Sequence, residues 1–155
     1  MELGVYGFYF ESKEARSWVR DNEPWCFGSH PLLLGDNDPR DRDIPTLDWL
    51  QLWVHTHGLP PLVKTRMTGE TIGATLGVFV DAPWDEDGQC RGEAVKFRYW
   101  HSLASPLRRG ILLRFKEFKE SIRCSLTHSK LPTLCGNCGQ IGHGPRACDL
   151  SLIHI

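Results

Sequence analysis

The sequence Cys-Gly-Asn-Cys-Gly-Gln-Ile-Gly-His-Gly-Pro-Arg-Ala-Cys spans residues 135–148 and governs how the C-terminal part of the chain can fold. This segment is too short to form a hydrophobic core, but its cysteine and histidine residues follow the spacing C-x2-C-x4-H-x4-C. The four candidate ligands are Cys135, Cys138, His143 and Cys148. Three thiolates and one imidazole suit tetrahedral zinc, and Gly139 and Gly142 can adopt the backbone angles that bring the later ligands round. The sequence therefore predicts one zinc ion, whose binding is coupled to folding.

The ligand spacing of residues 131–148 resembles that of a zinc knuckle of the CCHC type, a module of retroviral nucleocapsids and many RNA-binding proteins. Knuckles that bind RNA tightly usually carry an aromatic residue directly after the first cysteine, where this chain has Gly136. Ile141 is the only large apolar side chain between the ligands, so the surface for base stacking is small. Zinc binding is therefore favoured over strong, sequence-specific RNA binding by this segment alone.

The composition suits one ordinary domain with a small appendage. The chain has 155 residues, of which 41% are hydrophobic, and six tryptophans are enough to fill a core. No run of about 18 apolar residues and no leader pattern is found, so neither a membrane span nor secretion is predicted, and an intracellular protein is expected. Cys26, Cys90 and Cys124 are scattered singly, which indicates reduced, buried structural cysteines rather than a disulfide framework.

The charges are distributed unevenly along the chain. Residues 36–87 hold ten acidic and four basic side chains, whereas residues 88–148 hold eleven basic and three acidic ones. The basic part predicts a polyanionic partner; the alternative is a solvated face whose charge is balanced by the acidic segment. The candidate phosphate contacts are Arg108, Arg109, Arg114, Lys116, Lys119, Arg123, Lys130 and Arg146.

The N-terminal residues 1–34 are predicted to form a strand, a helix and a second strand. Aromatic and β-branched residues predict a strand over 3–10. Ser12 is a candidate N-cap for a helix that ends near Asn22, before Pro24. The second strand runs towards Leu34. Residues 35–46 are rich in Asp, Asn and Pro and are predicted to be a linker or long loop.

Residues 47–130 are predicted to form one α+β domain with a basic hairpin. The stretch 49–57 alternates in polarity and carries apolar groups on both faces, which predicts a central strand. His55 and His57 share one face of it, and without a third ligand they are interpreted as a packed or surface pair. Further strands are predicted over 78–81, 93–100, 111–115 and 121–128.

A helix is predicted between the first two of these strands. Thr65 or Thr68 can cap it, and it runs to about residue 76 with Gly77 as a left-handed stop. Gly69, Gly73 and Gly77 recur every four residues, which indicates that the helix approaches a sheet closely.

The order strand, helix, strand, strand resembles the RNA-recognition motif, with a basic hairpin where a second helix would stand. The third strand of that motif carries two stacking aromatic residues, and both are missing from the corresponding residues 91–98. Phe97, Tyr99 and Trp100 are therefore expected to pack rather than to stack on bases. The predicted fold class is α+β: a small RNA-recognition-motif-like sheet-and-helix domain plus a C-terminal zinc knuckle.

Five phrases carry a wider resemblance over residues 5–148. They are Glu-Pro-Trp-Cys-Phe-Gly-Ser-His (23–30), Leu-Trp-Val-His-Thr-His-Gly-Leu-Pro (52–60), Ile-Gly-Ala-Thr-Leu-Gly (72–77), Ser-Pro-Leu-Arg-Arg-Gly (105–110) and Lys-Leu-Pro-Thr-Leu-Cys-Gly-Asn-Cys-Gly-Gln-Ile-Gly-His (130–143). The chain resembles a plant family in which a domain of unknown function precedes one CCHC knuckle. Its members are gag-like first-reading-frame proteins of plant non-LTR retrotransposons and derived host genes. The resemblance implies zinc and nucleic-acid binding without established catalysis. It also implies an N-terminally truncated domain, and residues 149–155 resemble no part of the family and are expected to be an unstructured or artefactual tail.

Two functional hypotheses follow. The first is a non-enzymatic module that binds single-stranded nucleic acid, RNA being favoured, with low sequence specificity. The second is a protein-interaction or assembly module with a purely structural zinc, in which the basic hairpin docks an acidic partner, including another copy of the chain. Catalysis is not favoured, because a closed four-ligand zinc leaves no position for water and no nucleophile or acid/base set stands out.

Overall fold

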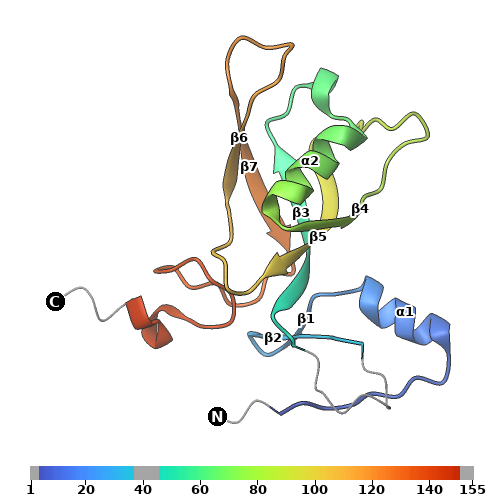
Figure 1. Cartoon of the computed structure of the whole chain (residues 1–155), viewed down its shortest axis with the longest axis vertical. Coiled ribbons are helices and arrows are strands. Elements are labelled where there is room, and N and C mark those ends of the chain that lie inside the picture. The colour runs from blue at the N-terminus through green and yellow to red at the C-terminus, as the bar shows by residue number, and fades with distance from the viewer. Residues whose placement is uncertain (1–3, 37–45, 151–155) are drawn as a thin grey trace.

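The computed structural model describes residues 4–36 and 46–150; most of the predicted linker (37–45) and most of the predicted tail (151–155) lie outside the described residues. The described residues form two α-helices, a five-stranded antiparallel sheet and a separate two-stranded sheet (Figure 1). The predicted α+β fold class, with a Cys/His cluster at its C-terminal end, is confirmed. Neither described helix is long and apolar enough to cross a membrane.

The large sheet is built around the strand that the sequence placed at its centre. Its spatial order is β4-β5-β3-β7-β6. The strands are β3 (Trp49–His57), β4 (Val78–Asp81), β5 (Val95–Ser102), β6 (Gly110–Leu113) and β7 (Ile122–Ser129). All neighbours are antiparallel. The β6–β7 hairpin occupies the place of the second helix of an RNA-recognition motif, as predicted. Strand β5 begins and ends two residues later than expected.

The core lies between one face of this sheet and α2 (Arg66–Leu76). Alternation along β3 and β5 directs Leu52, Val54 and Phe97 to this face, where they are fully buried together with Ile72 of the helix. Thr65 caps α2, because its side chain accepts a hydrogen bond from the backbone N–H of Thr68. Phe97 and Tyr99 are buried, which confirms that they pack inside the domain.

The glycines of α2 allow the close approach that their spacing predicted. A Cβ atom at Gly69 would lie 2.4 Å from the ring of Trp84, and one at Gly73 would lie 2.7 Å from Phe79. At Gly77 it would lie 2.0 Å from the carbonyl oxygen of Trp100. The predicted left-handed stop is wrong, because Gly77 has a φ of 174° and is extended. Glycine is required at 77 by contact with β5 rather than by a positive φ.

The N-terminal part confirms the predicted helix and corrects the strand before it. α1 (Lys13–Asp21) starts at Ser12, whose side chain accepts from the N–H of Ala15, and it ends at Asn22. Residues 4–10 form no regular structure, so the predicted strand is wrong there. Aromatic residues favour a strand only where a neighbouring strand pairs with the backbone, and no strand within residues 4–36 or 46–150 does so here.

Two short strands, β1 (Trp25–Phe27) and β2 (His30–Leu32), form a hairpin where one longer strand was expected. Gly28 takes the positive φ of 62° that this turn requires. Cys124 is buried and Cys90 half-buried, as expected of structural cysteines, whereas Cys26 is exposed, which corrects the prediction for that residue.

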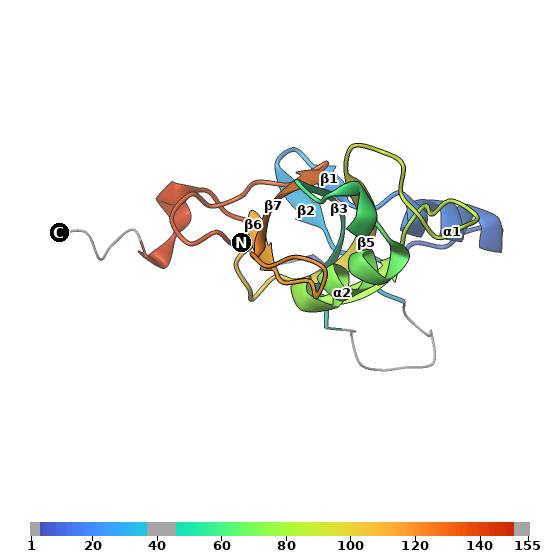
Figure 2. The same cartoon turned by 90° about the horizontal axis from the view of Figure 1, so that it is seen from above.

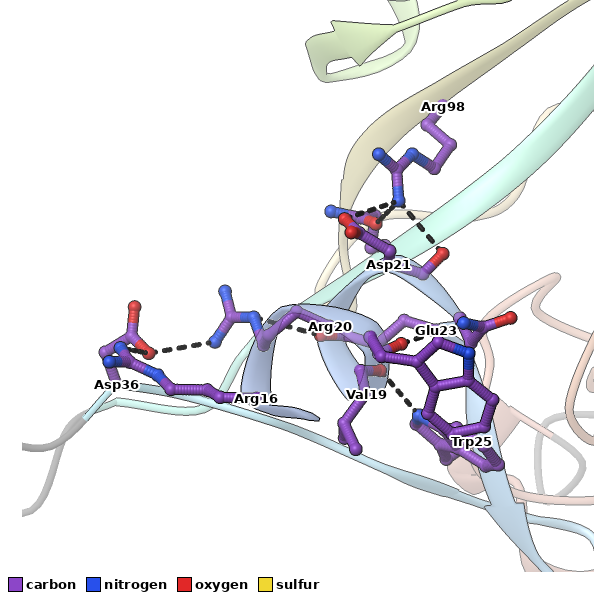
Figure 3. A network of polar contacts seen from close by, with 11 residues as sticks. Arg16, Val19, Arg20, Asp21, Glu23, Trp25, Asp36 and Arg98 are labelled. Atoms are coloured by element: carbon purple, nitrogen blue, oxygen red, sulfur yellow. Dashed lines mark hydrogen bonds and ion pairs between the residues drawn. The ribbon is translucent and has the colours of Figure 1, made fainter. Parts of the chain in front are cut away.

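Arg98 of β5 joins the N-terminal part to the sheet (Figure 3). Its guanidinium is 8% exposed and donates two hydrogen bonds to the carboxylate of Asp81, at 2.7 and 2.6 Å. It also donates to the side-chain oxygen of Gln51 and to the backbone carbonyl of Asp21, each at 3.0 Å. The last bond places a cation at the C-terminus of α1, where the helix dipole favours one. Arg98 thereby connects α1 to β3, β4 and β5.

Glu23 lies below α1 with a carboxyl group that is 1% exposed (Figure 3). Its only ion pair among the described residues is with the Nε of Arg20 at 3.3 Å, and neither carboxyl oxygen accepts a hydrogen bond from a described group. Burial raises the pKa of Glu23 from its ordinary 4.5 to about 7, against the opposing charges of Arg20 and Arg98. The folded chain therefore binds a proton here that the unfolded chain releases.

Glu23→Gln should stabilise the chain as the pH rises. Between pH 4.5 and about 7 the folded state holds a proton that the unfolded state has lost, so wild-type stability falls over this range. Gln does not ionise, so the free energy of unfolding of the variant should exceed that of the wild type by an amount that grows towards about pH 8, with an upper bound of roughly 3 kcal/mol. Thermal unfolding of both proteins at several pH values measures this difference. Glu14→Gln, at an exposed position of the same helix, should show no such growth.

Gly77→Ala should destabilise the sheet domain by roughly 1–3 kcal/mol, since its methyl group would overlap the Trp100 carbonyl. Gly7→Ala is the matched control, because a Cβ atom there has no neighbour within 4 Å. Urea unfolding of both variants measures the difference. Equal midpoints for the two variants would contradict the close approach of α2 to β5.

Candidate metal centre

The four predicted ligands converge at the C-terminal end of the chain. One ligand atom each from Cys135, Cys138, His143 and Cys148 lies within 4.8 Å of all the others. The Sγ of Cys138 is 3.3 Å from the Nε2 of His143. A tetrahedral ion with metal–sulfur bonds of about 2.3 Å requires ligand separations of roughly 3.8 Å, and three sulfurs and one imidazole form a soft-to-borderline donor set. The cluster can therefore hold one metal ion.

Backbone turns bring the ligands together in the way that the glycines predicted. Gly139 and Gly142 have φ values of 75° and 107°, which only glycine adopts readily. The N–H of Gly139 donates to the carbonyl of Cys135, and the N–H of Cys135 donates to Gln140, each at 2.9 Å. A short 3-10 helix, η2 (Pro145–Ala147), then places Cys148. These turns thus bring the cysteine and histidine side chains of the cluster together.

The thiols of the cluster differ in acidity. Burial acts to raise the pKa of Cys135, but backbone N–H groups of Cys138 and Asn137 outweigh it and lower the pKa to about 6. Burial raises the pKa of Cys148. Cys135 therefore offers a thiolate near neutral pH, the form in which cysteine binds a metal.

The knuckle, residues 131–148, is packed against the sheet domain rather than tethered to it. The N–H of Leu107 donates to the carbonyl of Gly139 at 2.8 Å, and the side chain of Gln140 donates to the carbonyl of Ala104 at 2.9 Å. Ile141 is 6% exposed and belongs to the main hydrophobic core. The one large apolar side chain between the ligands therefore packs inside the protein, where no base can reach it.

A second contact joins the knuckle to the N-terminal hairpin. Thr133 donates from both its backbone N–H and its hydroxyl to the carbonyl of Ser29, at 3.0 and 2.8 Å. Sequence analysis missed Ser29, Ala104 and Leu107 as positioning residues. Their contribution is made by backbone atoms, which leave no signal in residue type or spacing.

The eight candidate phosphate contacts are all exposed. The structure does not gather them into one cluster. Arg114, Lys116 and Lys119 lie in the loop between β6 and β7, at the end of the hairpin that is far from the knuckle (Figure 1). Arg108 and Arg109 precede β6, Arg123 lies on β7, Lys130 follows β7, and Arg146 lies on η2. They are therefore distributed along the hairpin and onto the knuckle.

None of these eight cations forms an ion pair with a described acidic group. By contrast, five other arginines, namely Arg16, Arg20, Arg66, Arg91 and Arg98, each pair with a carboxylate. The described part of the acidic segment thus does not neutralise the hairpin, which argues against a simple balance of charge between the two.

The two histidines of β3 are half-buried and have no third candidate ligand among the described residues. The rings of His55 and His57 are nearly parallel, with centroids 6.4 Å apart. Each Nε2 lies within hydrogen-bond distance of a hydroxyl on β7, Ser129 at 2.9 Å and Thr127 at 3.0 Å. These contacts confirm the interpretation as a packed surface pair.

No protein-family model matches this sequence, and neither a curated protein nor a solved structure matches it. The geometry of the cluster and the charges around it are therefore the basis for assigning a function.

His143→Ala should abolish metal binding and also destabilise the sheet domain. Loss of the ion removes the turn that presents Ile141 and Gly139 to the domain, so we expect one cooperative transition with a Tm lowered by roughly 10 °C. Elemental analysis and thermal unfolding measure both effects. His30→Ala, in exposed β2, should keep the metal and the Tm. Equal metal content in the two variants would reject the site.

Proposed function

We propose that this chain is a zinc-binding, non-enzymatic protein that binds single-stranded nucleic acid, RNA in the first place, with low sequence specificity. The observation that carries the proposal is a set of eight exposed cations, none of which forms an ion pair with a described acidic group, distributed along the β6–β7 hairpin and onto the CCHC knuckle. Zinc is the ion that best suits three thiolates and one imidazole in tetrahedral arrangement. Such thiolates persist in a reducing, intracellular compartment.

Electrostatics supports a polyanion as the partner. Unpaired lysine and arginine side chains release condensed counterions when they meet phosphates, and this release drives binding. The hairpin loop and the knuckle both supply cations, so an extended strand of several nucleotides can contact them together (Figure 1). Phosphate contacts carry no sequence information, which accounts for the low specificity that we propose.

The packing of Phe97, Tyr99 and Ile141 supports low specificity as well. Sequence-specific recognition of single strands uses exposed aromatic or arginine planes on which bases stack. Phe97 and Tyr99 are buried under α2, and Ile141 of the knuckle is buried in the core. The proposed binding surface is therefore chiefly electrostatic. A closed set of four ligands leaves no position for a reacting water, which is why the function is proposed to be non-enzymatic.

The resemblance to gag-like proteins of plant retrotransposons is consistent with this function. It depends on phrases in the sequence, and the shared features are one CCHC knuckle and an upstream α+β domain. We propose membership of that group as the origin of the chain.

A protein-interaction or assembly module is the second candidate. It is favoured by the buried Ile141, which gives the knuckle a structural role, and by large exposed apolar side chains before α1. The two candidates differ in what the basic hairpin contacts, so an RNA titration separates them.

Arg108→Ala with Arg109→Ala should weaken binding to unrelated single-stranded RNAs about equally. Each lost phosphate contact should reduce the slope of log K against log salt by about 0.7, so the double variant should lose about 1.4. Filter binding with the zinc-loaded chain measures this. Arg66→Ala with Arg91→Ala removes the same charge from arginines that are paired with carboxylates, and it should leave the slope unchanged. Absence of binding by the wild type at low salt would reject the proposal.

A further inference from the structure

The segment 4–10 (Gly-Val-Tyr-Gly-Phe-Tyr-Phe) is the most exposed apolar stretch of the described chain. Tyr9 is 91% exposed, and Tyr6 and Phe8 are exposed nearly as far. The backbone of this segment belongs to no helix or strand and forms no backbone hydrogen bond with another described residue. Large exposed apolar surfaces of this kind mark interaction sites. The sequence has the composition of a strand, but it pairs with no described strand of the same copy.

The β1–β2 hairpin offers the complementary feature, which is an unpaired sheet edge. Each of its strands has a neighbour on one side only. Phe27 at the end of β1 is 81% exposed, and Cys26 is exposed beside it. A strand that joined this edge would lie beside both side chains and satisfy backbone groups that now face water.

The register of the hairpin selects β1 as the receiving strand. Cys26 lies opposite Pro31. Proline has no N–H, so this pair cannot exchange both ladder hydrogen bonds, and it is the non-bonded type of antiparallel pair. The N–H and C=O of Cys26 therefore point to the free edge of β1. The free edge of β2 lacks a backbone N–H donor at Pro31, so an added strand cannot form the full set of ladder hydrogen bonds there.

The chemistry of both features fits a second copy of this chain. Neither residues 4–10 nor residues 25–27 carry a charge, so nothing in them selects an acidic protein or a phosphate backbone. An uncharged donor strand and an uncharged open edge on the same chain can pair reciprocally about a two-fold axis, with each copy donating one strand and receiving one.

We propose that two copies of this chain form a two-fold dimer in which residues 4–10 of each copy add a strand to the free edge of β1 of the other. The interface lies on the N-terminal part of the molecule. Seen from above, α1 and the knuckle lie at opposite ends of the protein (Figure 2). The proposed interface contains none of the eight candidate phosphate contacts, so the dimer does not depend on nucleic-acid binding.

Light scattering of the nuclease-treated, zinc-loaded full chain tests the proposal. The mass should rise from one copy to two as the concentration increases. Tyr6→Glu with Phe8→Glu places charges in the donor strand at exposed positions and should raise the dissociation constant about tenfold or more. Leu62→Glu with Met67→Glu changes two equally exposed apolar residues elsewhere and should leave it unchanged.

Amide hydrogen exchange identifies the surface independently of these variants. Amides of residues 5–10 and of Cys26 should become protected as the concentration rises, while those of the β6–β7 loop should not. A chain that stays monomeric at every concentration overturns the proposal, and so does a dimer that protects the basic hairpin instead. If another kind of molecule covers this segment, the purified chain will give the monomeric result.

Discussion

The buried guanidinium of Arg98 is the interaction on which the arrangement of this protein depends. A charge taken out of water costs several kcal/mol unless its partners are in place, and Arg98 of β5 has partners on three other elements: Asp21 at the end of α1, Gln51 on β3 and Asp81 on β4. Its paired hydrogen bonds to Asp81 raise the pKa of the guanidinium, so it remains charged. Arg20 of α1, 5.6 Å from the ring centroid of Trp100, adds a cation–π contact beside it. The N-terminal part is therefore positioned largely by polar contacts, and the apolar side chains of residues 5–10 remain exposed.

The C-terminal end is held by an apolar side chain in the core and by backbone hydrogen bonds. Ile141 enters the same core as Val54 and Phe97, and backbone bonds from Leu107 and to Ser29 fix the knuckle in two places. A structural ion normally stabilises only the few residues around it, but here the turn that the ion closes supplies part of the core of the sheet domain. Metal binding and domain stability are thus coupled, and the knuckle contributes to the fold as well as to the charge of the surface.

Features encoded locally could be predicted from the sequence, and those that depend on distant partners could not. The ligand spacing of the cluster, the caps at Ser12 and Thr65 and the alternation along 49–57 lie within a few residues, and the structure confirms them. The strand over 3–10 was wrong because aromatic residues favour strands only where another strand pairs with them. Gly77 was assigned a left-handed φ because the carbonyl of Trp100, the atom that excludes a side chain, lies 23 positions further along the chain. The docking of the knuckle was not predicted, because the knuckle is held by main-chain atoms of Ser29, Ala104 and Leu107, and every residue type has such atoms.

The double hydrogen bond between Thr133 and Ser29 has a mechanical consequence. It joins two points that are 104 residues apart along the chain. Tension applied from outside these two points, for example during threading through a narrow pore, passes across this contact as well as through the bonds of Asp21, Gly139 and Gln140 to the sheet domain. The five strands therefore do not bear the load alone, and the bonds between Thr133 and Ser29 must break before the chain between these two residues can extend.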